Sequence, residues 1–406
     1  MALAVAARDS GDPPESPRAP ADTQLEPVAP PAPPPAVPLA TGLSERNANL
    51  LRADPGPAEF EPWRARVEAL RPRFYRLMVD WSQIQSDPGR PPAFDQADDG
   101  CLRDRPPCAR FAGMRDVLRA VRAQQQENGG WEVVVAIYGV PEWAARRAHG
   151  CERSTELPRS RPFAPAGLEG YRALVRDLLR LAEAERVELK WWSPWNEPNH
   201  PYFISPQRAR CDPRAPSVAA RTYTAIARAL QDELRRAGGD RRLVLGEMAA
   251  ADEPEKLLTA VTEMVEALPD DVACAGDVWA QHEYAERALD RERGDPVAQL
   301  RRALDARECT RDKRIWVTET GVGGRRVGAR RTLSAREQRV DCRAMAASLR
   351  RWADDERVDA AFQFSFREDT AFPVGLVDSG LTRVYTVYEL WKDWADGEGS
   401  ARACGG

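Results

Sequence analysis

The chain has 406 residues, of which 43% are hydrophobic and 30% charged, a composition typical of a globular domain of roughly 250–350 residues with tails. Its net charge of −4 gives no electrostatic reason to expect a nucleic-acid partner. It contains no run of about 18 apolar residues, so we expect no membrane span. Composition does not indicate an oligomeric state.

Cysteine and histidine usage argues against a metal site and for disulfide bonds. None of the eight cysteines lies in a C-x-x-C motif, and the only histidines are His149, His200 and His282. Zinc-ligand spacing is missing, so we expect no metal and no cofactor. An even number of scattered cysteines predicts disulfides in a secreted, extracellular or periplasmic protein. The alternative interpretation is buried free thiols in a cytosolic protein.

The beginning of the chain has a composition that cannot form a core. Residues 15–38 are rich in proline and alanine, which favours an extended linker. The opening stretch MALAVAA is too short for a complete signal peptide, and the remnant of one is one interpretation of it. We predict a linker over 1–38, one folded domain over 39–396 and a tail over 397–406.

From residue 37 onward, short apolar segments alternate with longer amphipathic ones. The apolar segments predict strands, and the segments with apolar residues at helical spacing predict helices. The expected strands are 37–43, 74–81, 131–140, 188–195, 241–250, 277–284, 313–320 and 359–366. The expected helices are 57–72, 114–126, 171–185, 220–239, 254–268, 295–306, 334–355 and 382–394.

This alternation predicts an α/β protein with a parallel sheet, because continuously apolar strands are buried on both faces. Eight strand–helix units over about 355 residues favour a closed (β/α)8 TIM barrel. The alternative is an open doubly wound sheet, which usually carries a glycine-rich phosphate turn after its first strand. The stretch GVGG at 321–324 follows the seventh strand and lacks the G-x-G-x-x-G spacing, which favours the barrel.

The barrel topology suggests which cysteines lie near one another. Two expected pairs are Cys101 with Cys108, in the insert 82–113, and Cys151 with Cys211, in the loops after the third and fourth strands. The remaining four are Cys274 and Cys309, which precede strands, and Cys342 and Cys404. We expect the first two of these to pair with the last two, in an order that the sequence does not fix.

Polar residues stand in otherwise apolar text on four expected strands. They are Arg76 on the second strand, Asn196 and Glu197 on the fourth, His282 and Tyr284 on the sixth, and Glu319 on the seventh. In a barrel the carboxyl ends of the strands meet in one central pocket. Two carboxylates with an arginine, a histidine and a tyrosine form a candidate acid/base site.

Hydrolysis of a glycosidic bond needs this kind of pair, one acid and one carboxylate opposite it. We expect the tryptophan-rich surroundings of Glu197 to disfavour its anion and keep it protonated. Arg76 and Tyr284 are expected to favour the anion of Glu319. Trp191 and Trp192 are adjacent on a strand, so their rings should lie on opposite faces.

Several segments together resemble the clan A glycoside hydrolases, closest to family 39-like or family 5-like enzymes. WSPWNEPN resembles the acid/base motif at the end of the fourth barrel strand, and IWVTETG resembles the nucleophile strand. YRLMVDWSQI, IYGVPEWA and HEY resemble the second, third and sixth strands. The resemblance covers roughly residues 40–396, and it implies a retaining enzyme that acts on a carbohydrate.

The resemblance also implies roles for single residues. Glu197 would be the acid/base and Glu319 the nucleophile, with Asn196 on the sugar 2-hydroxyl, Arg76 orienting Glu319, and His282 and Tyr284 lining the subsite. Further candidates for substrate binding are Trp81, Trp143, His200 and Phe366. The clan often has a tryptophan at the end of strand eight, where this sequence has FQFSFRED.

Each of these candidates has a plainer interpretation. Trp81 and Trp143 are either platforms for sugar stacking or packing residues, and His200 either contacts sugar or caps a loop. Two other functions stay open beside the secreted retaining hydrolase. One is a transglycosylase that uses the same site, and the other is a carbohydrate-binding barrel without catalysis, which would normally lack one of the two glutamates.

Overall fold

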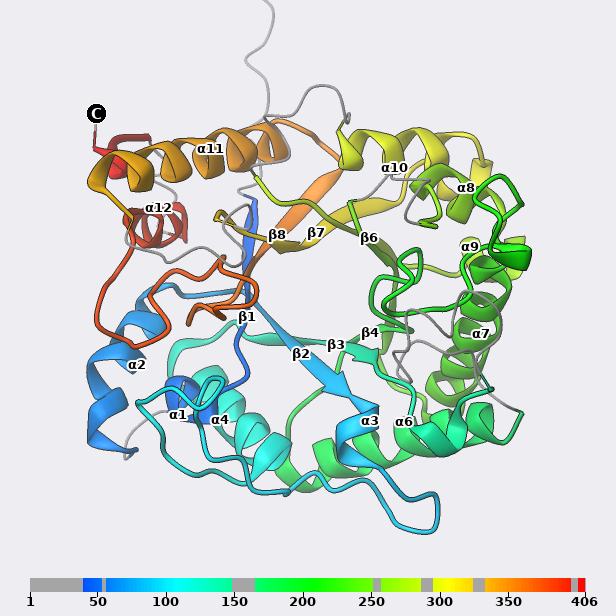
Figure 1. Ribbon diagram of the computed structural model, residues 1–406, viewed down its shortest axis with the longest axis horizontal. Coiled ribbons are helices and arrows are strands. Elements are labelled where there is room, and N and C mark those ends of the chain that lie inside the picture. Colours follow the sequence, from blue (N-terminus) through cyan, green and yellow to red (C-terminus); the bar gives the residue numbers. More distant parts are fainter. Residues whose placement is uncertain are drawn as a thin grey trace, which may run out of the picture. The chain divides into compact units, whose positions relative to one another are not determined.

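The computed structural model describes residues 39–52, 56–147, 165–250, 257–285, 295–323, 333–395 and 401–405. In this part of the chain, eight parallel strands form a closed barrel in chain order, and β8 pairs with β1 (Figure 1). The strands are β1 (Ala40–Ser44), β2 (Phe74–Asp80), β3 (Glu132–Tyr138), β4 (Trp191–Ser193), β5 (Arg242–Met248), β6 (Val278–His282), β7 (Arg314–Thr320) and β8 (Val358–Phe364). The predicted TIM barrel is therefore confirmed, and the open sheet is excluded.

Helices surround the strands (Figure 1). They are α1 (Ala48–Leu51), α2 (Glu61–Ala69), α3 (Trp81–Ile84), α4 (Gly113–Asn128), α6 (Pro165–Glu185), α7 (Ala219–Ala237), α8 (Val261–Glu266), α9 (Asp270–Ala273), α10 (Pro296–Asp305), α11 (Ala335–Ala353) and α12 (Thr386–Ala395). Short 3₁₀ turns, among them η7 (Glu308–Thr310) and η9 (Ala401–Cys404), complete the described part. No described helix has the length and apolar character needed to cross a bilayer.

One expected helix is shorter in the structure than in the sequence analysis. The segment 254–268 begins in residues that the structure does not describe, and the helix in its described part is α8. The backbone N–H of Thr259 donates to the carbonyl of Asn199 at 3.0 Å instead of making a helical bond. This tether to the loop after β4 delays the start of the helix.

The fourth strand is shorter than expected at both ends, and its end at Ser193 follows from Pro194, which has no backbone N–H to continue the ladder. Its two tryptophans lie on opposite faces, as the alternation predicts. The Trp191 ring packs inside the barrel against Trp316, with ring centroids 4.6 Å apart. Trp192 is fully buried in the layer between barrel and helices.

Apolar side chains fill the barrel interior near the starts of the strands. This cluster contains Phe74, Val134, Val244, Val278, Ala280, Trp316, Ala360 and Phe362. Gly42 on β1 makes room for it, because a Cβ at that position would lie 2.2 Å from the Phe362 ring. The filled interior leaves the carboxyl ends of the strands as the place for a site.

The disulfides agree with the sequence analysis at one point and correct it at another. Cys101 is bonded to Cys108, as expected, whereas Cys151 lies outside the described residues, so its expected bond to Cys211 stays a prediction.

The expected cross-pairing of the last four cysteines is wrong, since Cys274 is bonded to Cys309 and Cys342 to Cys404. Cys274 and Cys309 both precede neighbouring strands, β6 and β7, which brings them together. Cys342 lies on α11, where Cys404 in η9 reaches it.

Candidate active site

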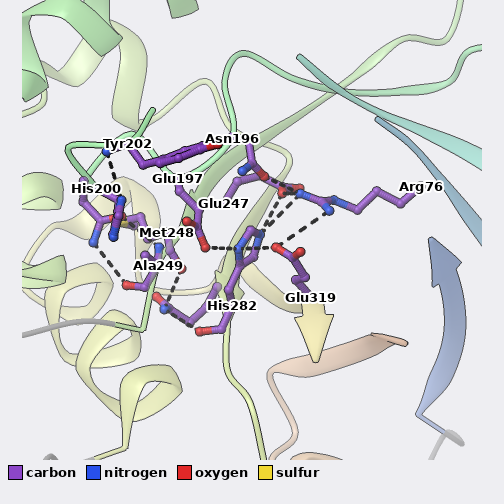
Figure 2. A network of polar contacts seen from close by, with 12 residues as sticks. Arg76, Asn196, Glu197, His200, Tyr202, Glu247, Met248, Ala249, His282 and Glu319 are labelled. Carbon is purple, nitrogen blue, oxygen red and sulfur yellow. Dashed lines mark hydrogen bonds and ion pairs between the residues drawn. The ribbon is translucent and has the colours of Figure 1, made fainter. Parts of the chain in front are cut away.

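The two glutamates singled out in the sequence meet at one histidine. His282, the last residue of β6, has its Nδ1 atom 2.9 Å from Oε1 of Glu197 and 2.7 Å from Oε2 of Glu319 (Figure 2). Glu197 follows β4, and Glu319 lies near the end of β7. Residues from three strands therefore form one cluster at the carboxyl end of the barrel.

The cluster is closed at its base and accessible at the two glutamates. The Glu197 side chain is 17% exposed and that of Glu319 is 8% exposed. Arg76 on β2 is completely buried beneath them, with its Nη1 atom 3.9 Å from Oε2 of Glu319. A ligand that enters from solvent can reach the carboxylates, whereas the cation that supports Glu319 stays behind them.

Glu197 is held by a turn with a left-handed backbone. Its φ is 39°, a conformation that costs a non-glycine residue energy and that clusters at functional sites. The Glu197 N–H donates to the carbonyl of Glu247 at 2.9 Å, and the Asn196 N–H donates to the carbonyl of Ile137 at 2.9 Å. Bonds to both neighbouring strands thus fix the direction of the Glu197 side chain.

Glu247 on β5 is a member of this cluster that the sequence analysis missed. Its Oε2 atom accepts a hydrogen bond from Nη2 of Arg76 and lies 2.9 Å from Nε2 of His282 (Figure 2). The side chain has no solvent exposure. A lone acidic residue at the end of the apolar segment RRLVLGEMAA was the signal that could have found it.

Bulges explain why two of the carboxylates face the interior. On β5, Val244 faces inward and Leu245 outward, so strict alternation would turn Glu247 toward the helices. The register between β5 and β6 shifts at Gly246 and Met248, which leaves Glu247 as the extra residue. A similar shift between β7 and β8 lies at Glu319.

The charges in the cluster support one another. Burial alone would raise the pKa of Glu247, but the positive charge of Arg76 and a hydrogen bond with His282 lower it to about 2. Burial likewise opposes the anion of Glu319, yet the charges of His282 and Arg76 lower the pKa of that carboxyl below its usual value. Both carboxylates are therefore anionic at neutral pH.

His282 carries the matching positive charge. Burial by itself would lower the pKa of this imidazole, but the charge of Glu319 and hydrogen bonds with Glu197, Glu247 and Glu319 raise it well above 6.5. Burial and the charges of Glu319 and Glu197 raise the pKa of the Tyr284 hydroxyl well above 10, so Tyr284 stays protonated beside Glu319. A protonated hydroxyl and an imidazolium both donate to the nucleophile predicted from the sequence.

Two other predicted site residues lie at the same place. Asn196 is 2% exposed, and its Oδ1 atom accepts from Nη2 of Arg76 at 2.6 Å. Tyr284 has its ring 4.9 Å from that of Phe372, in the segment after β8. Phe364, the last residue of β8, lies 6.0 Å from Phe372. Tyr284, Phe364 and Phe372 thus form an aromatic wall.

Three predicted substrate-binding residues contact packing neighbours. Trp81 is fully buried, and its Nε1 donates to Oε1 of Gln85 at 2.7 Å. The Trp143 ring packs edge-on against Trp81 at 5.5 Å, and its Nε1 donates to the Gln85 carbonyl at 2.9 Å. Phe366 is fully buried against Tyr388 on α12. Their surroundings are those of packing residues between the barrel and the helices.

His200 and Trp195 make hydrogen bonds within the loop after β4. The Nδ1 of His200 accepts a hydrogen bond from the Tyr202 N–H at 3.0 Å (Figure 2), which is the geometry of a loop cap. Trp195 is fully buried, and its Nε1 donates to the Phe203 carbonyl at 2.9 Å. The tryptophans near Glu197 therefore do not form the desolvating shell that the sequence analysis expected. The hydrogen-bond partner of the Glu197 carboxylate is the imidazole of His282.

The cluster also has the atoms to bind a cation. One oxygen each of Glu197 and Glu319 and a nitrogen of His282 lie within 4.8 Å of one another. However, Arg76 and the protonated His282 already supply the positive charge that these carboxylates need. We therefore interpret the three residues as acid/base groups. Such groups suit proton transfer and the transfer of an acyl or glycosyl group to a buried carboxylate.

Comparison with known proteins shows which solved structures share this fold. No protein-family model matches the sequence, and no curated protein matches it. Among solved structures, a family 39 glycoside hydrolase from Bacteroides cellulosilyticus WH2 aligns with a TM-score of 0.50 and 13% identity, over 88% of this chain and 63% of that chain. This chain therefore spans less than two thirds of that enzyme's length.

Two further structures match over nearly their whole length. The GH1 β-glucosidase from Exiguobacterium antarcticum B7 aligns with a TM-score of 0.55 and 11% identity, over 89% of this chain and 98% of that chain. PbGH5A, a glycoside hydrolase family 5 enzyme from Prevotella bryantii B14, aligns with a TM-score of 0.51 and 13% identity, over 88% and 96%. At these identities the likeness shows the fold alone, and at that level the predicted resemblance to the (β/α)8 barrels of clan A glycoside hydrolases is confirmed.

Proposed function

We propose that this protein is a retaining glycoside hydrolase with Glu319 as nucleophile and Glu197 as acid/base. The observation that carries the proposal is the spacing of the two carboxylates, whose nearest oxygens lie within 4.8 Å. Retaining enzymes place the two carboxyls about 5–5.5 Å apart, whereas inverting enzymes need about 6.5–9.5 Å to admit a water. The close approach of these two oxygens favours the retaining arrangement.

In the first half of the reaction, the Glu319 carboxylate attacks the anomeric carbon and forms a glycosyl ester. Glu197 gives its proton to the departing glycosidic oxygen as the old bond breaks. Arg76 and the hydroxyl of Tyr284 support this step, because a group that must attack as an anion benefits from positive charge and donors beside it.

In the second half, water replaces the departed group. Glu197, now a carboxylate, takes a proton from the water while the water oxygen attacks the anomeric carbon. Glu319 leaves that carbon as a carboxylate. The product sugar has the configuration of the substrate because the carbon is inverted twice. The substrate class is a carbohydrate: an oligosaccharide, a polysaccharide or a glycoside.

The protein is proposed to act outside the cytoplasm. The described residues hold three disulfides, Cys101–Cys108, Cys274–Cys309 and Cys342–Cys404. Such bonds persist in secreted and periplasmic proteins and are rare where thiols are kept reduced.

The test replaces each glutamate by its amide and measures turnover of a panel of aryl glycosides. We expect Glu319→Gln and Glu197→Gln each to lower kcat by at least about 10²–10³-fold. Glu233→Gln is the matched control, because Glu233 is a buried carboxylate on α7 that pairs with Arg176 at 3.0 Å, outside the barrel. Wild-type turnover in both active-site variants would rule out this mechanism.

A second measurement tests retention directly. In Glu197→Ala, azide can enter the space of the missing carboxylate and attack the glycosyl ester without a general base. We expect azide to restore part of the activity and to give a glycosyl azide with the configuration of the substrate. An azide product of the opposite configuration, assigned by NMR, would show that the enzyme inverts.

A further inference from the structure

We propose that Glu247 is a positioning residue that holds the His282 ring and the Arg76 guanidinium in place behind the two catalytic glutamates. The consequence for turnover rests on the proposed function, but the structural part of the inference does not. Glu247 has no solvent exposure, so it acts through its neighbours and does not contact a substrate.

The contacts of His282 define its orientation and its protons. Its Nε2 atom lies 2.9 Å from Oε2 of Glu247, and its Nδ1 atom lies between Glu197 and Glu319 (Figure 2). Ionised carboxylates only accept hydrogen bonds, so a ring with carboxylates at both nitrogens is best satisfied as the doubly protonated imidazolium. Glu247 fixes one end of the ring, and the other end must then face the catalytic pair.

Glu247 also anchors the guanidinium of Arg76. Nη2 of Arg76 donates to Glu247 and, at 2.6 Å, to Asn196, whereas Nη1 approaches Glu319 only to 3.9 Å. The guanidinium is therefore anchored through Glu247 and supports Glu319 from a distance. Without the Glu247 carboxylate, the remaining ion-pair partner of Arg76 among the described residues would be Glu319, at 3.9 Å.

The backbone of Glu247 adds an independent link to the site. Its carbonyl accepts the hydrogen bond from the Glu197 N–H at 2.9 Å, which stabilises the left-handed turn of the acid/base residue. Glu247 itself has φ 53° at the β5 bulge, and the N–H of the preceding Gly246 is held by the Tyr223 hydroxyl at 2.9 Å. A strained, bulged residue that contacts the cluster through both backbone and side chain is typical of a functional site.

In the described part of the chain, few charged and titratable groups face His282. They are Glu247, Glu197, Glu319 and Arg76, with Tyr284 beside Glu319 and Tyr223 beside Glu247. Of the three carboxylates, Glu247 is the one without solvent exposure, so solvent screens its effect on the imidazole least. Its removal should lower the pH at which His282 loses its proton.

The test is an NMR titration of the histidine rings in the full chain. Only three histidines occur, and a His282→Gln variant assigns the signals of His282. We expect His282 in the wild type to keep imidazolium shifts well above pH 6.5, and Glu247→Gln to move the midpoint to lower pH. Glu247→Asp keeps the charge and should restore part of the shift, while Glu233→Gln should leave the titration unchanged.

The result that overturns the proposal is an identical His282 midpoint in the wild type and Glu247→Gln. If Glu247→Gln does not fold, the wild-type titration carries the test, and a His282 midpoint at or below pH 6.5 overturns the proposal too. The titration needs no substrate, so its outcome is separate from that of the hydrolase assay. Where hydrolysis is observed, Glu247→Gln should lower kcat and leave KM nearly unchanged, because the residue lies out of reach of the substrate.

Discussion

Arg76 and Glu247, which are 171 residues apart in the chain, form an ion pair inside the barrel with neither side chain exposed. They come from β2 and β5, so the pair links distant parts of the barrel wall. Removing two charges from water costs several kcal/mol per ion, and the pair offsets this cost only while both members are present. Its stability is therefore conditional on both partners.

The first prediction concerns this dependence. Arg76→Met removes the cation that pairs with Glu247 and leaves the His282 imidazolium as its one charged partner among the described residues. We expect the free energy of unfolding to fall by about 3–5 kcal/mol in urea denaturation. The double variant Arg76→Met/Glu247→Gln removes both charges, so it should be more stable than the single variant. Equal stability of the single and double variants would contradict this account of the pair.

The second prediction concerns pH and a carboxyl outside the barrel. Glu283 has no exposed side-chain surface and pairs with Arg351, but among the described residues its Oε2 atom has no hydrogen-bond partner. Burial raises the pKa of Glu283 to about 7, with the charge of Arg351 opposing the rise. Because the folded state holds this proton more tightly than the unfolded state, the contribution of Glu283 to stability is greatest below about pH 4.5 and is lost as the pH rises through 7.

We therefore expect Glu283→Gln to remove a pH-dependent loss of stability on the order of 2 kcal/mol between pH 5 and pH 8. The measurement is the difference in unfolding free energy between wild type and variant at the two pH values. Glu233→Gln serves as the control for a buried carboxylate that has several arginine partners. A difference that stays constant with pH would show that Glu283 does not titrate in this range.

The third prediction concerns the insert between α3 and α4. Arg367, just after β8, is 3% exposed, and its guanidinium donates to the carbonyls of Arg105 and Pro106 at 3.0 Å each and of Ser379 at 2.8 Å. The insert turn that it binds is closed by Cys101–Cys108. The guanidinium of Arg367 therefore joins the insert to the segment after β8, which carries Phe372 of the aromatic wall.

Arg367→Lys retains a charge but cannot reach several carbonyls at once. We expect faster amide hydrogen exchange over residues 98–111, and a rise in KM larger than the fall in kcat, because the wall moves while the glutamates stay. Arg90→Lys in the same insert is the control, since the Arg90 side chain is 83% exposed. Unchanged exchange in Arg367→Lys would mean that the insert is held by other contacts.

Much of the barrel follows from patterns that are local in the sequence. Continuous apolar segments such as 131–140 are buried on both faces in any parallel sheet, and alternation correctly places Trp191 and Trp192 on opposite sides of β4. Arg76 and His282 share strand parity with inward-facing Phe74 and Ala280, so their direction is predictable as well. Tryptophans are harder, because a large ring packs equally well in a core or on a substrate, and Trp81 is fully buried in the core.

The cysteines show a different limit. Cys101 and Cys108 are close in sequence, so their bond requires only a local turn. The bonds Cys274–Cys309 and Cys342–Cys404 depend on which loops and helices become neighbours, and this is set by the whole barrel. The even number of cysteines therefore predicted disulfide bonds, but it did not predict how the last four cysteines pair.

The sequence by itself determined the barrel and two carboxylates at its carboxyl end, because hydrophobic periodicity and the Asn-Glu and Thr-Glu-Thr segments are local. Only the tertiary structure decided that Glu319 and Glu247 both face the interior, since each does so through a bulge that depends on the pairing of neighbouring strands. The protonation of His282 is likewise collective, because it depends on the burial of the ring and on charges from three other strands or strand ends. Strand identity is a property of short segments, whereas a buried charge network exists only after distant segments have excluded water between them.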